Sequence, residues 1–305
     1  MNGAQNERLT ALIASALAQP PYPAAYRVVD AIRASHGACV RAVLFYGSCR
    51  RSWQPDGVLD FYVLVDSYRS YHGSLVRSLM NYLLPPDVSF LRTENPSPDR
   101  ESGGAIAAKV TVISFDQFAR RMRRDAIDTT AWARFTQPSS LLYVADEATK
   151  KHLISALSTG VRTACGWAAQ RAPAGAPSAV FWSRLFTMTY AAELRVERGN
   201  RPEIIYDNDA DYYDGIFNAL ELDRPHPSAT AMPGSWAIRR IAGKILSVLR
   251  LCKGAFTFEG GVDYLLWKIE RHTGYAVSLS PWQQRHPIMA APRLLYRLYR
   301  QGILR

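Results

Sequence analysis

Hydrophobic and polar positions divide the chain into a first half in which predicted strands and helices alternate and a second half in which the spacing is helical. In the first half, short apolar runs are bounded by glycine, proline and polar residues, which is typical of buried strands. The strands predicted there cover residues 42–46, 58–65 and 107–114. The helices predicted there, from apolar positions three and four residues apart, cover residues 6–18, 26–35, 67–84 and 115–124.

Beyond residue 146 the apolar positions follow helical spacing alone, and no internal repeat or low-complexity tract interrupts them. A stretch rich in proline, histidine and serine at 224–234 has the composition of a linker. We therefore expect an α+β domain at 1–145, a mostly helical domain at 146–224 and a C-terminal helical segment at 235–305. The helices predicted in this half cover residues 147–171, 181–198, 212–222, 236–251 and 262–271.

Composition places the chain among ordinary globular proteins. Of its 305 residues, 48% are hydrophobic and 21% are charged, which excludes disordered and fibrous classes. No apolar run has the length that a membrane-spanning helix needs, and the N-terminus lacks the pattern of a secretion signal, so we expect a cytoplasmic protein. The cysteines are scattered without metal-ligand spacing and are expected to be reduced thiols: Cys39, Cys49, Cys165 and Cys252.

The charge balance is strongly basic. Lysine and arginine total 37 against 26 acidic residues, which gives a net charge of +11, and six of the 37 are lysines. One explanation is a general bias toward arginine in the source genome. The other is an anionic partner, such as a nucleotide, a nucleic acid or an acidic lipid surface.

A glycine–serine turn followed by a strand carboxylate is the main chemical signal in the sequence. Gly47 and Ser48 follow the first predicted strand, and Asp60 lies inside the second. Glycine lets the backbone approach a phosphate group, while serine and backbone amides donate hydrogen bonds to it. A strand aspartate can hold Mg²⁺, which neutralises phosphate charge. A turn glycine and a buried, hydrogen-bonded aspartate would give the same pattern without any chemistry.

This arrangement resembles the beginning of polymerase-beta-type nucleotidyltransferases, with one departure. Those enzymes carry a second carboxylate two residues after the first, on the same face of the strand, whereas this chain has Tyr62 there. The next acid, Asp66, is about 20 Å from Asp60 along a straight strand, so the two should not share a metal ion. We expect Asp66 to cap the helix that begins at residue 67.

A colinear set of short motifs is similar to the Tam41 family of CTP:phosphatidate cytidylyltransferases, which also lacks the second strand carboxylate. The segment FYGSCRRS, followed by LDFYVLVDSYRSYH, resembles the first motif block of that family. Later segments resemble its other blocks in the same order, and the whole set spans about residues 42–260. These segments are AKVTVIS at 108–114, ARFTQP at 133–138, TYAAELR at 189–195 and CKGAFT at 252–257.

The resemblance implies a polymerase-beta-type nucleotidyltransferase domain with a mixed sheet at 1–145 and a winged-helix-like domain at 146–224. It also implies that Mg²⁺ is the cofactor and that a cytidylyl group passes from CTP to phosphatidate. Asp60 and Lys109 would be catalytic residues, and Asp60 and Glu193 would be metal ligands. Cys49 stands where that family has glycine, which weakens the likeness of the phosphate loop. The nucleotide-binding residues would be Tyr46, Gly47, Ser48, Arg134 and Lys253.

Each of these assignments has a structural alternative. Lys109 can be an edge-strand lysine whose amine reaches solvent, and Arg134 can form a surface ion pair. Glu193 can pair with a nearby arginine instead of a metal ion. Lys253 is expected on a loop that ends a helix, where it would either bind phosphate or belong to an ordinary C-cap.

The C-terminal end carries a separate signal. No acid follows Glu270, and leucines and arginines are interspersed in the segment PRLLYRLYRQGILR at 292–305. This composition is typical of an interfacial helix on an anionic membrane, and we assign lipid contact to Arg293, Arg297 and Arg300. A helix that docks on the core and leaves its arginines in solvent is the alternative.

The sequence therefore favours an enzyme, peripheral on the inner face of the cell membrane, that makes CDP-diacylglycerol and pyrophosphate, and no nucleic-acid partner is expected. Two alternatives stay open. One is a nucleotidyltransferase of the same fold acting on another phosphorylated acceptor or an RNA end. The other is an inactive homologue that binds lipid or nucleotide, which the missing second carboxylate would explain.

Overall fold

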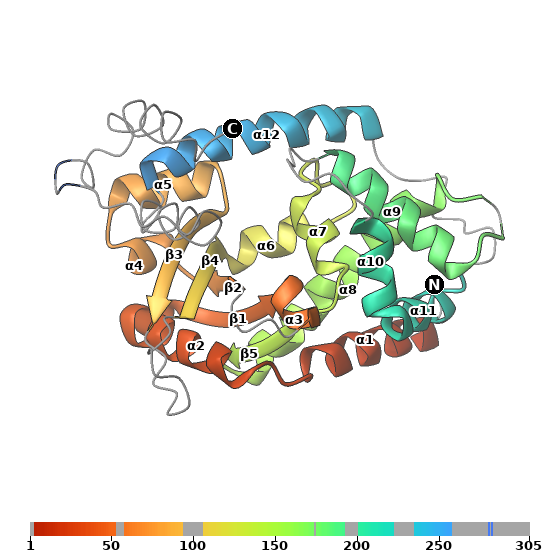
Figure 1. Cartoon of the computed structure of the whole chain (residues 1–305), viewed down its shortest axis with the longest axis horizontal. Coiled ribbons are helices and arrows are strands. Elements are labelled where there is room, and N and C mark those ends of the chain that lie inside the picture. Colours follow the sequence, from red (N-terminus) through yellow and green to blue (C-terminus); the bar gives the residue numbers. More distant parts are fainter. Residues whose placement is uncertain are drawn as a thin grey trace, which may run out of the picture.

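The structure is a computed structural model in which helices cover both faces of one five-stranded sheet (Figure 1). It describes residues 3–52, 58–93, 106–173, 175–192, 201–222 and 235–257, together with Ser280 and Trp282. The strand order is β3-β4-β2-β1-β5, and β2 and β4 are parallel while the other neighbours are antiparallel. This mixed sheet confirms the predicted α+β class. The strands are β1 (Val40–Tyr46), β2 (Leu59–Val65), β3 (Asp87–Thr93), β4 (Ile106–Ser114) and β5 (Ser140–Val144).

Helices form the rest of the described secondary structure, apart from a 3₁₀ turn at Gly37–Cys39. Between residues 146 and 222 the described part of the chain is helical and contains no strand, so the strands of a winged helix are not among the described residues. The helices are α1 (Gly3–Leu17), α2 (Pro23–His36), α3 (Ser48–Ser52), α4 (Tyr68–His72), α5 (Leu75–Leu83), α6 (Phe115–Arg121), α7 (Thr130–Phe135), α8 (Glu147–Ala169), α9 (Ser178–Ala192), α10 (Arg201–Asn208), α11 (Ala210–Ala219) and α12 (Trp236–Thr257).

Two hydrophobic cores lie on the two faces of the sheet, because successive side chains of a strand point to opposite faces. Leu44 and Leu64 belong to the larger core, which also contains residues of α1, α6, α7, α8, α9 and α11. Val43 and Val63 belong to the smaller core, which α2 and α4 complete. The larger core joins the sheet directly to the helices beyond residue 146, so the two halves of the chain pack as one body around it.

The helix predicted over 67–84 is two helices, and the reason is local. Gly73 ends α4 with φ +64°, in the left-handed region that favours glycine. Ser67 and Ser74 each begin a helix, because their side-chain oxygens accept hydrogen bonds from backbone amides three residues later. The predicted cap at Asp66 is therefore wrong: Ser67 caps α4, and Asp66 is an exposed residue at the end of β2.

Three further elements differ from the sequence prediction. The strands β3 and β5 were not predicted, and the polar segment near residue 201 forms the helix α10. Most side chains of β3 and β5 are only partly buried, so neither strand shows the continuous apolar run that marks β1, β2 and β4.

Two expectations from composition concern membrane spans and thiols. Within the described residues, no helix combines the length and the apolar character needed to cross a bilayer. Among the described residues, Cys39, Cys49 and Cys165 are buried and form no disulfide bond, and the side chain of Cys252 lies outside the described part.

Candidate functional site

Three residues assigned from sequence lie in one row across the sheet. Tyr46 of β1 is paired with Asp60 of β2, and Asp60 is paired with Lys109 of β4. Residues that are level on neighbouring strands point to the same face of a sheet. Because Tyr46 belongs to the larger core, the row lies on the face covered by α6, α7 and α8. The structure thus brings together residues that are up to 63 positions apart in the chain.

The backbone at Gly47 passes unusually close to the Asp60 carboxylate. Gly47 has φ +92°, which L-residues rarely adopt. A Cβ atom added there would lie 2.6 Å from Asp60 Oδ2 and 3.3 Å from Asp60 Cβ, and contacts under 3.0 Å essentially never occur for real Cβ atoms. The backbone angle favours glycine at this position, and a Cβ atom there would also displace the Asp60 carboxylate.

Asp60 and Lys109 form a loose ion pair that solvent reaches. Lys109 Nζ lies 3.9 Å from Asp60 Oδ1, and the side chains are 39% and 25% exposed. An ion pair with this exposure contributes little to folding stability. It does place one negative and one positive group side by side where a ligand from solvent can contact both.

Arg134 lies against Tyr46, a contact that the sequence did not predict. Its Nη1 donates a hydrogen bond to the Tyr46 hydroxyl at 3.0 Å, and its guanidinium carbon is 5.2 Å from the ring centroid. Tyr62 lies behind this pair, and burial raises the pKa of its phenol to about 12 although Arg134 acts in the opposite direction. Tyr62 therefore stays protonated at neutral pH and does not replace the missing second carboxylate.

The residues present fit Mg²⁺ only in part. Within the described part of the chain, no three histidine, cysteine or acidic side chains come together as a metal site. Mg²⁺ is commonly held by one or two carboxylates together with substrate phosphates, so Asp60 fits a magnesium–nucleotide complex better than a metal ion alone. Glu193, assigned as the second ligand, lies outside the described residues, as do Arg293, Arg297 and Arg300, and their roles stay predictions. Ser48 is the first residue of α3.

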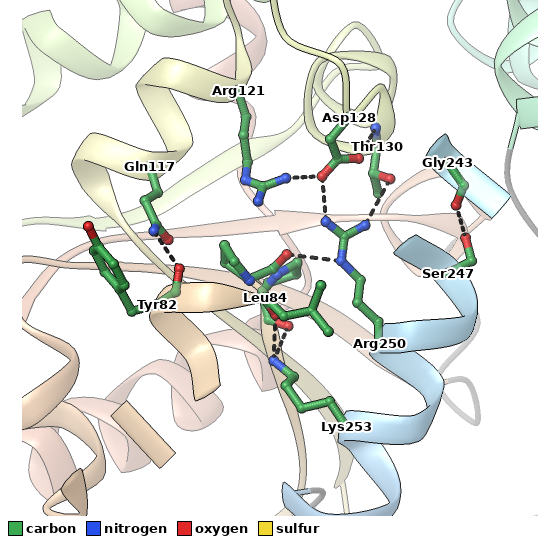
Figure 2. Close-up of polar contacts among 12 residues, drawn as sticks. Tyr82, Leu84, Gln117, Arg121, Asp128, Thr130, Gly243, Ser247, Arg250 and Lys253 are labelled. Carbon is green, nitrogen blue, oxygen red and sulfur yellow. Dashed lines mark hydrogen bonds and ion pairs between the residues drawn. The ribbon is translucent and has the colours of Figure 1, made fainter. Parts of the chain in front are cut away.

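Lys253 is placed differently from the sequence prediction (Figure 2). It lies inside α12 and not on a loop, and its side chain is 5% exposed. Its amine donates hydrogen bonds to the carbonyl oxygens of Leu84 at 2.9 Å and Pro86 at 2.7 Å, and lies 3.3 Å from the Asp87 carboxylate. Burial lowers the pKa of Lys253, and Asp87 opposes this shift. These contacts give Lys253 a structural role in holding α12 against β3, and we withdraw its assignment to phosphate binding.

Sequence reasoning missed an ion-pair network on the same side of α12. Figure 2 shows Arg121 and Arg250 both contacting the carboxylate of Asp128. Arg250 also donates to the Pro85 carbonyl at 2.9 Å, and burial lowers the pKa of Arg121 to about 10. The sequence carries no signal for this network, because Asp128 and Arg250 are 122 positions apart.

A cavity of about 730 Å³ is lined by Arg50 of α3, the helix that follows Gly47. Arg50, one helical turn after Gly47, lines it and lies 3.4 Å from the Asp209 carboxylate. Ser140, which is uncharged, also lines the cavity. Asp207 and Asp211 contribute two further carboxylates to the lining. The cavity has the size of sites for small molecules, and its lining favours neutral or cationic groups over anions.

Comparisons with known proteins leave the family open. No protein-family model matches the chain, and no curated protein matches it. Among solved structures, the chain is similar to a nucleotidyltransferase-like protein from Exiguobacterium sibiricum 255-15 over 91% of this chain and 92% of that chain, at 9% identity and a TM-score of 0.26. A likeness at this level carries no argument about function. The functional assignment therefore rests on the residues around Gly47 and Asp60.

Proposed function

We propose that the protein is a nucleotidyltransferase whose reaction takes place at the row formed by Tyr46, Asp60 and Lys109. The observation that carries this proposal is the contact between Gly47 and Asp60. A glycine whose added Cβ would lie 2.6 Å from a partly exposed carboxylate keeps the backbone open beside that carboxylate. Lys109 lies beside the same carboxylate, so a negative and a positive group meet at this opening.

Each residue of the row would have its own role in nucleotidyl transfer. Asp60 would hold Mg²⁺, which when bound supplies charge neutralisation on the nucleotide phosphates. Lys109 presents a positive charge to a phosphate oxygen beside the same carboxylate, and Gly47 lets the nucleotide approach the chain. Arg134 fixes the Tyr46 ring, which forms the wall of the site. Little covalent chemistry is required of the protein, because position and charge supply most of the catalysis.

We further propose CTP and phosphatidate as the substrates, on the strength of the colinear motifs. An oxygen of the phosphatidate phosphate would attack the α-phosphorus of CTP. The new P–O bond forms as the bond to the β-phosphate breaks, so the products are CDP-diacylglycerol and pyrophosphate. The position of Lys109 beside Asp60 supports this proposal, because Lys109 belongs to one of those motifs.

The acidic cavity favours a second candidate acceptor. Phosphatidate is an anion, and carboxylates at Asp207 and Asp211 would repel it from this cavity. A neutral or cationic small molecule seated there would contact Arg50 of α3, the helix that begins directly after Gly47. Nucleotidyl transfer to a small non-lipid acceptor is therefore the alternative that the same assay must include.

Pyrophosphate release from each nucleoside triphosphate, with and without vesicles containing phosphatidate, tests the proposal. We expect CTP turnover that depends on phosphatidate and Mg²⁺, and at least a hundredfold loss in Asp60→Asn. Such a loss corresponds to about 2.7 kcal/mol or more of transition-state stabilisation. Asp66→Asn is the matched control, because Asp66 is an exposed aspartate directly after the other end of the same strand.

Each other outcome points to a different conclusion. Turnover of Asp60→Asn above about a tenth of the wild-type rate would remove Asp60 from the chemistry. Turnover with a small amine or alcohol but not with phosphatidate would keep nucleotidyl transfer and refute the lipid acceptor. Nucleotide binding without turnover under any of these conditions would favour the inactive homologue.

A further inference from the structure

Exposed apolar side chains are concentrated on α5 and α12. The described part of the chain has 16 large hydrophobic residues that are exposed, and ten of them lie on these two helices. Single exposed apolar residues are normal on a protein surface, whereas a contiguous apolar patch marks an interaction site. The ten residues are Leu75, Val76, Leu79, Tyr82 and Leu83 on α5 and Ile238, Ile241, Ile245, Val248 and Leu249 on α12.

On each helix these residues form the face opposite the one that packs on the protein. In α12, the inward face carries Arg239, Arg250 and Lys253, which bind backbone carbonyls and the acids of the core. The outward residues recur at helical spacing from Ile238 to Leu249, so they form one stripe. Their exposure therefore follows from how the basic residues anchor the helix.

The two helices meet at one place on the molecule. Lys253 near the end of α12 donates to the Leu84 carbonyl, directly after the last residue of α5. Figure 1 shows α12 running along one edge of the molecule and reaching α5 at that end. The ten apolar residues, together with Arg240 and Lys244, are named the α5–α12 surface here.

We propose that the α5–α12 surface docks on an anionic lipid membrane. Neither α5 nor α12 contains an acidic residue, and Arg240 and Lys244 are exposed beside the apolar stripe of α12. An exposed apolar face bordered by lysine and arginine is the pattern of a helix that lies in a membrane interface. The surface involves neither the Gly47 turn nor Asp60, so the proposal does not depend on nucleotidyl transfer.

The same charges argue against two other occupants of this surface. A second copy of the chain would bring Arg240 and Lys244 toward their own counterparts, with no acid on either helix to pair with them. Residues 258–305 of this chain carry seven lysines and arginines against three acids, so they are also basic. An anionic lipid surface supplies the negative charge that both of these occupants lack.

Vesicle co-sedimentation of the full chain without nucleotide tests this inference. We expect binding to vesicles of phosphatidylcholine mixed with phosphatidylglycerol, and little binding to pure phosphatidylcholine. Two paired variants, Ile241→Glu/Ile245→Glu on α12 and Leu79→Glu/Leu83→Glu on α5, should each lower the partition coefficient at least tenfold. Ile204→Glu on α10 is the matched control, since Ile204 is 55% exposed and lies outside the surface.

A charge variant and a size measurement complete the experiment. Arg240→Gln/Lys244→Gln should lower binding to the anionic vesicles about tenfold and leave weak binding to pure phosphatidylcholine unchanged. All substituted side chains are exposed, and circular dichroism confirms that each variant is folded. Wild-type binding by either glutamate variant would overturn the proposal, as would a wild-type chain that binds no vesicle. A wild-type dimer that these variants convert to a monomer in sedimentation velocity would replace it with a self-association surface.

Discussion

Substituting Gly47 by alanine tests the structural basis of the site most directly. At φ +92° an alanine is strained by about 1–2 kcal/mol, as for other L-residues forced into left-handed conformations. The added methyl group would also lie 2.6 Å from Asp60 Oδ2, about 0.8 Å closer than the 3.4 Å at which ordinary contacts begin. Either the carboxylate or the turn must therefore move.

The two parts of this effect are separable by experiment. We expect Gly47→Ala to lower the free energy of unfolding by about 2–4 kcal/mol, measured by urea denaturation. In an Asp60→Ala background the contact with the carboxylate is gone, and a cost of about 1–2 kcal/mol from the backbone should remain. Gly73→Ala is the matched control, because Gly73 has φ +64° and no atom within 4 Å of an added Cβ.

Activity should respond more strongly than stability. A displacement of about 1 Å at a catalytic group costs about a hundredfold in rate, so Gly47→Ala should lose nearly all turnover while Gly73→Ala keeps it. The reasoning is refuted if Gly47→Ala costs the same in the wild-type and Asp60→Ala backgrounds. It is also refuted if the variant retains wild-type turnover.

Three further predictions concern stability. Ser67→Ala should lower the free energy of unfolding by about 1 kcal/mol because it removes the cap of α4, whereas Asp66→Asn should change it by less than about 0.5 kcal/mol, and urea denaturation compares them. Lys253→Met should cost about 2–4 kcal/mol in the same assay because it leaves Asp87 with fewer partners, and a stable variant with a raised KM for CTP would contradict the structural role. Burial lowers the pKa of His72 from 6.5 to about 4, so the unfolded state binds a proton that the folded state does not. Stability should therefore decrease as the pH falls from 6.5 toward 4, and His72→Gln should flatten this part of the curve relative to wild type.

The strands that the sequence predicted are those in which nearly every side chain is buried. Nearly all side chains of β1 and β2 are buried, since both lie inside the sheet and helices cover both faces. The edge strands β3 and β5 carry mixed side chains, and a mixed pattern over five to seven residues does not distinguish a strand from a loop. The break at Gly73 was missed although its cause is local, because helical spacing of apolar residues continues across Gly73 and Ser74, which end α4 and begin α5.

Part of the site was accessible from sequence because it is local. Gly47 directly follows β1 and Asp60 lies in β2, which is the next strand in the chain and the antiparallel neighbour of β1, so the sequence alone suggested that the two residues lie close together. The position of Lys109 opposite Asp60 was not accessible in this way, because it depends on the register of the parallel strands β2 and β4. The motif resemblance suggested Lys109, but the spacing of residues along the chain does not determine that register.

Basic, acid-free segments occur twice near the end of this chain, and α12 shows why composition alone does not assign their function. In α12 the cations Arg239, Arg250 and Lys253 point inward and bind carbonyls and carboxylates, while aliphatic side chains point outward. A sequence-based assignment of arginine to lipid and leucine to the core would invert this arrangement. The function of each cation depends on which hydrogen-bond acceptors the fold places near it. A buried arginine or lysine must bind acceptors within the protein, and it is then not available to a membrane. The segment 292–305 has the same composition, so its arginines need the same test before they are assigned to lipid.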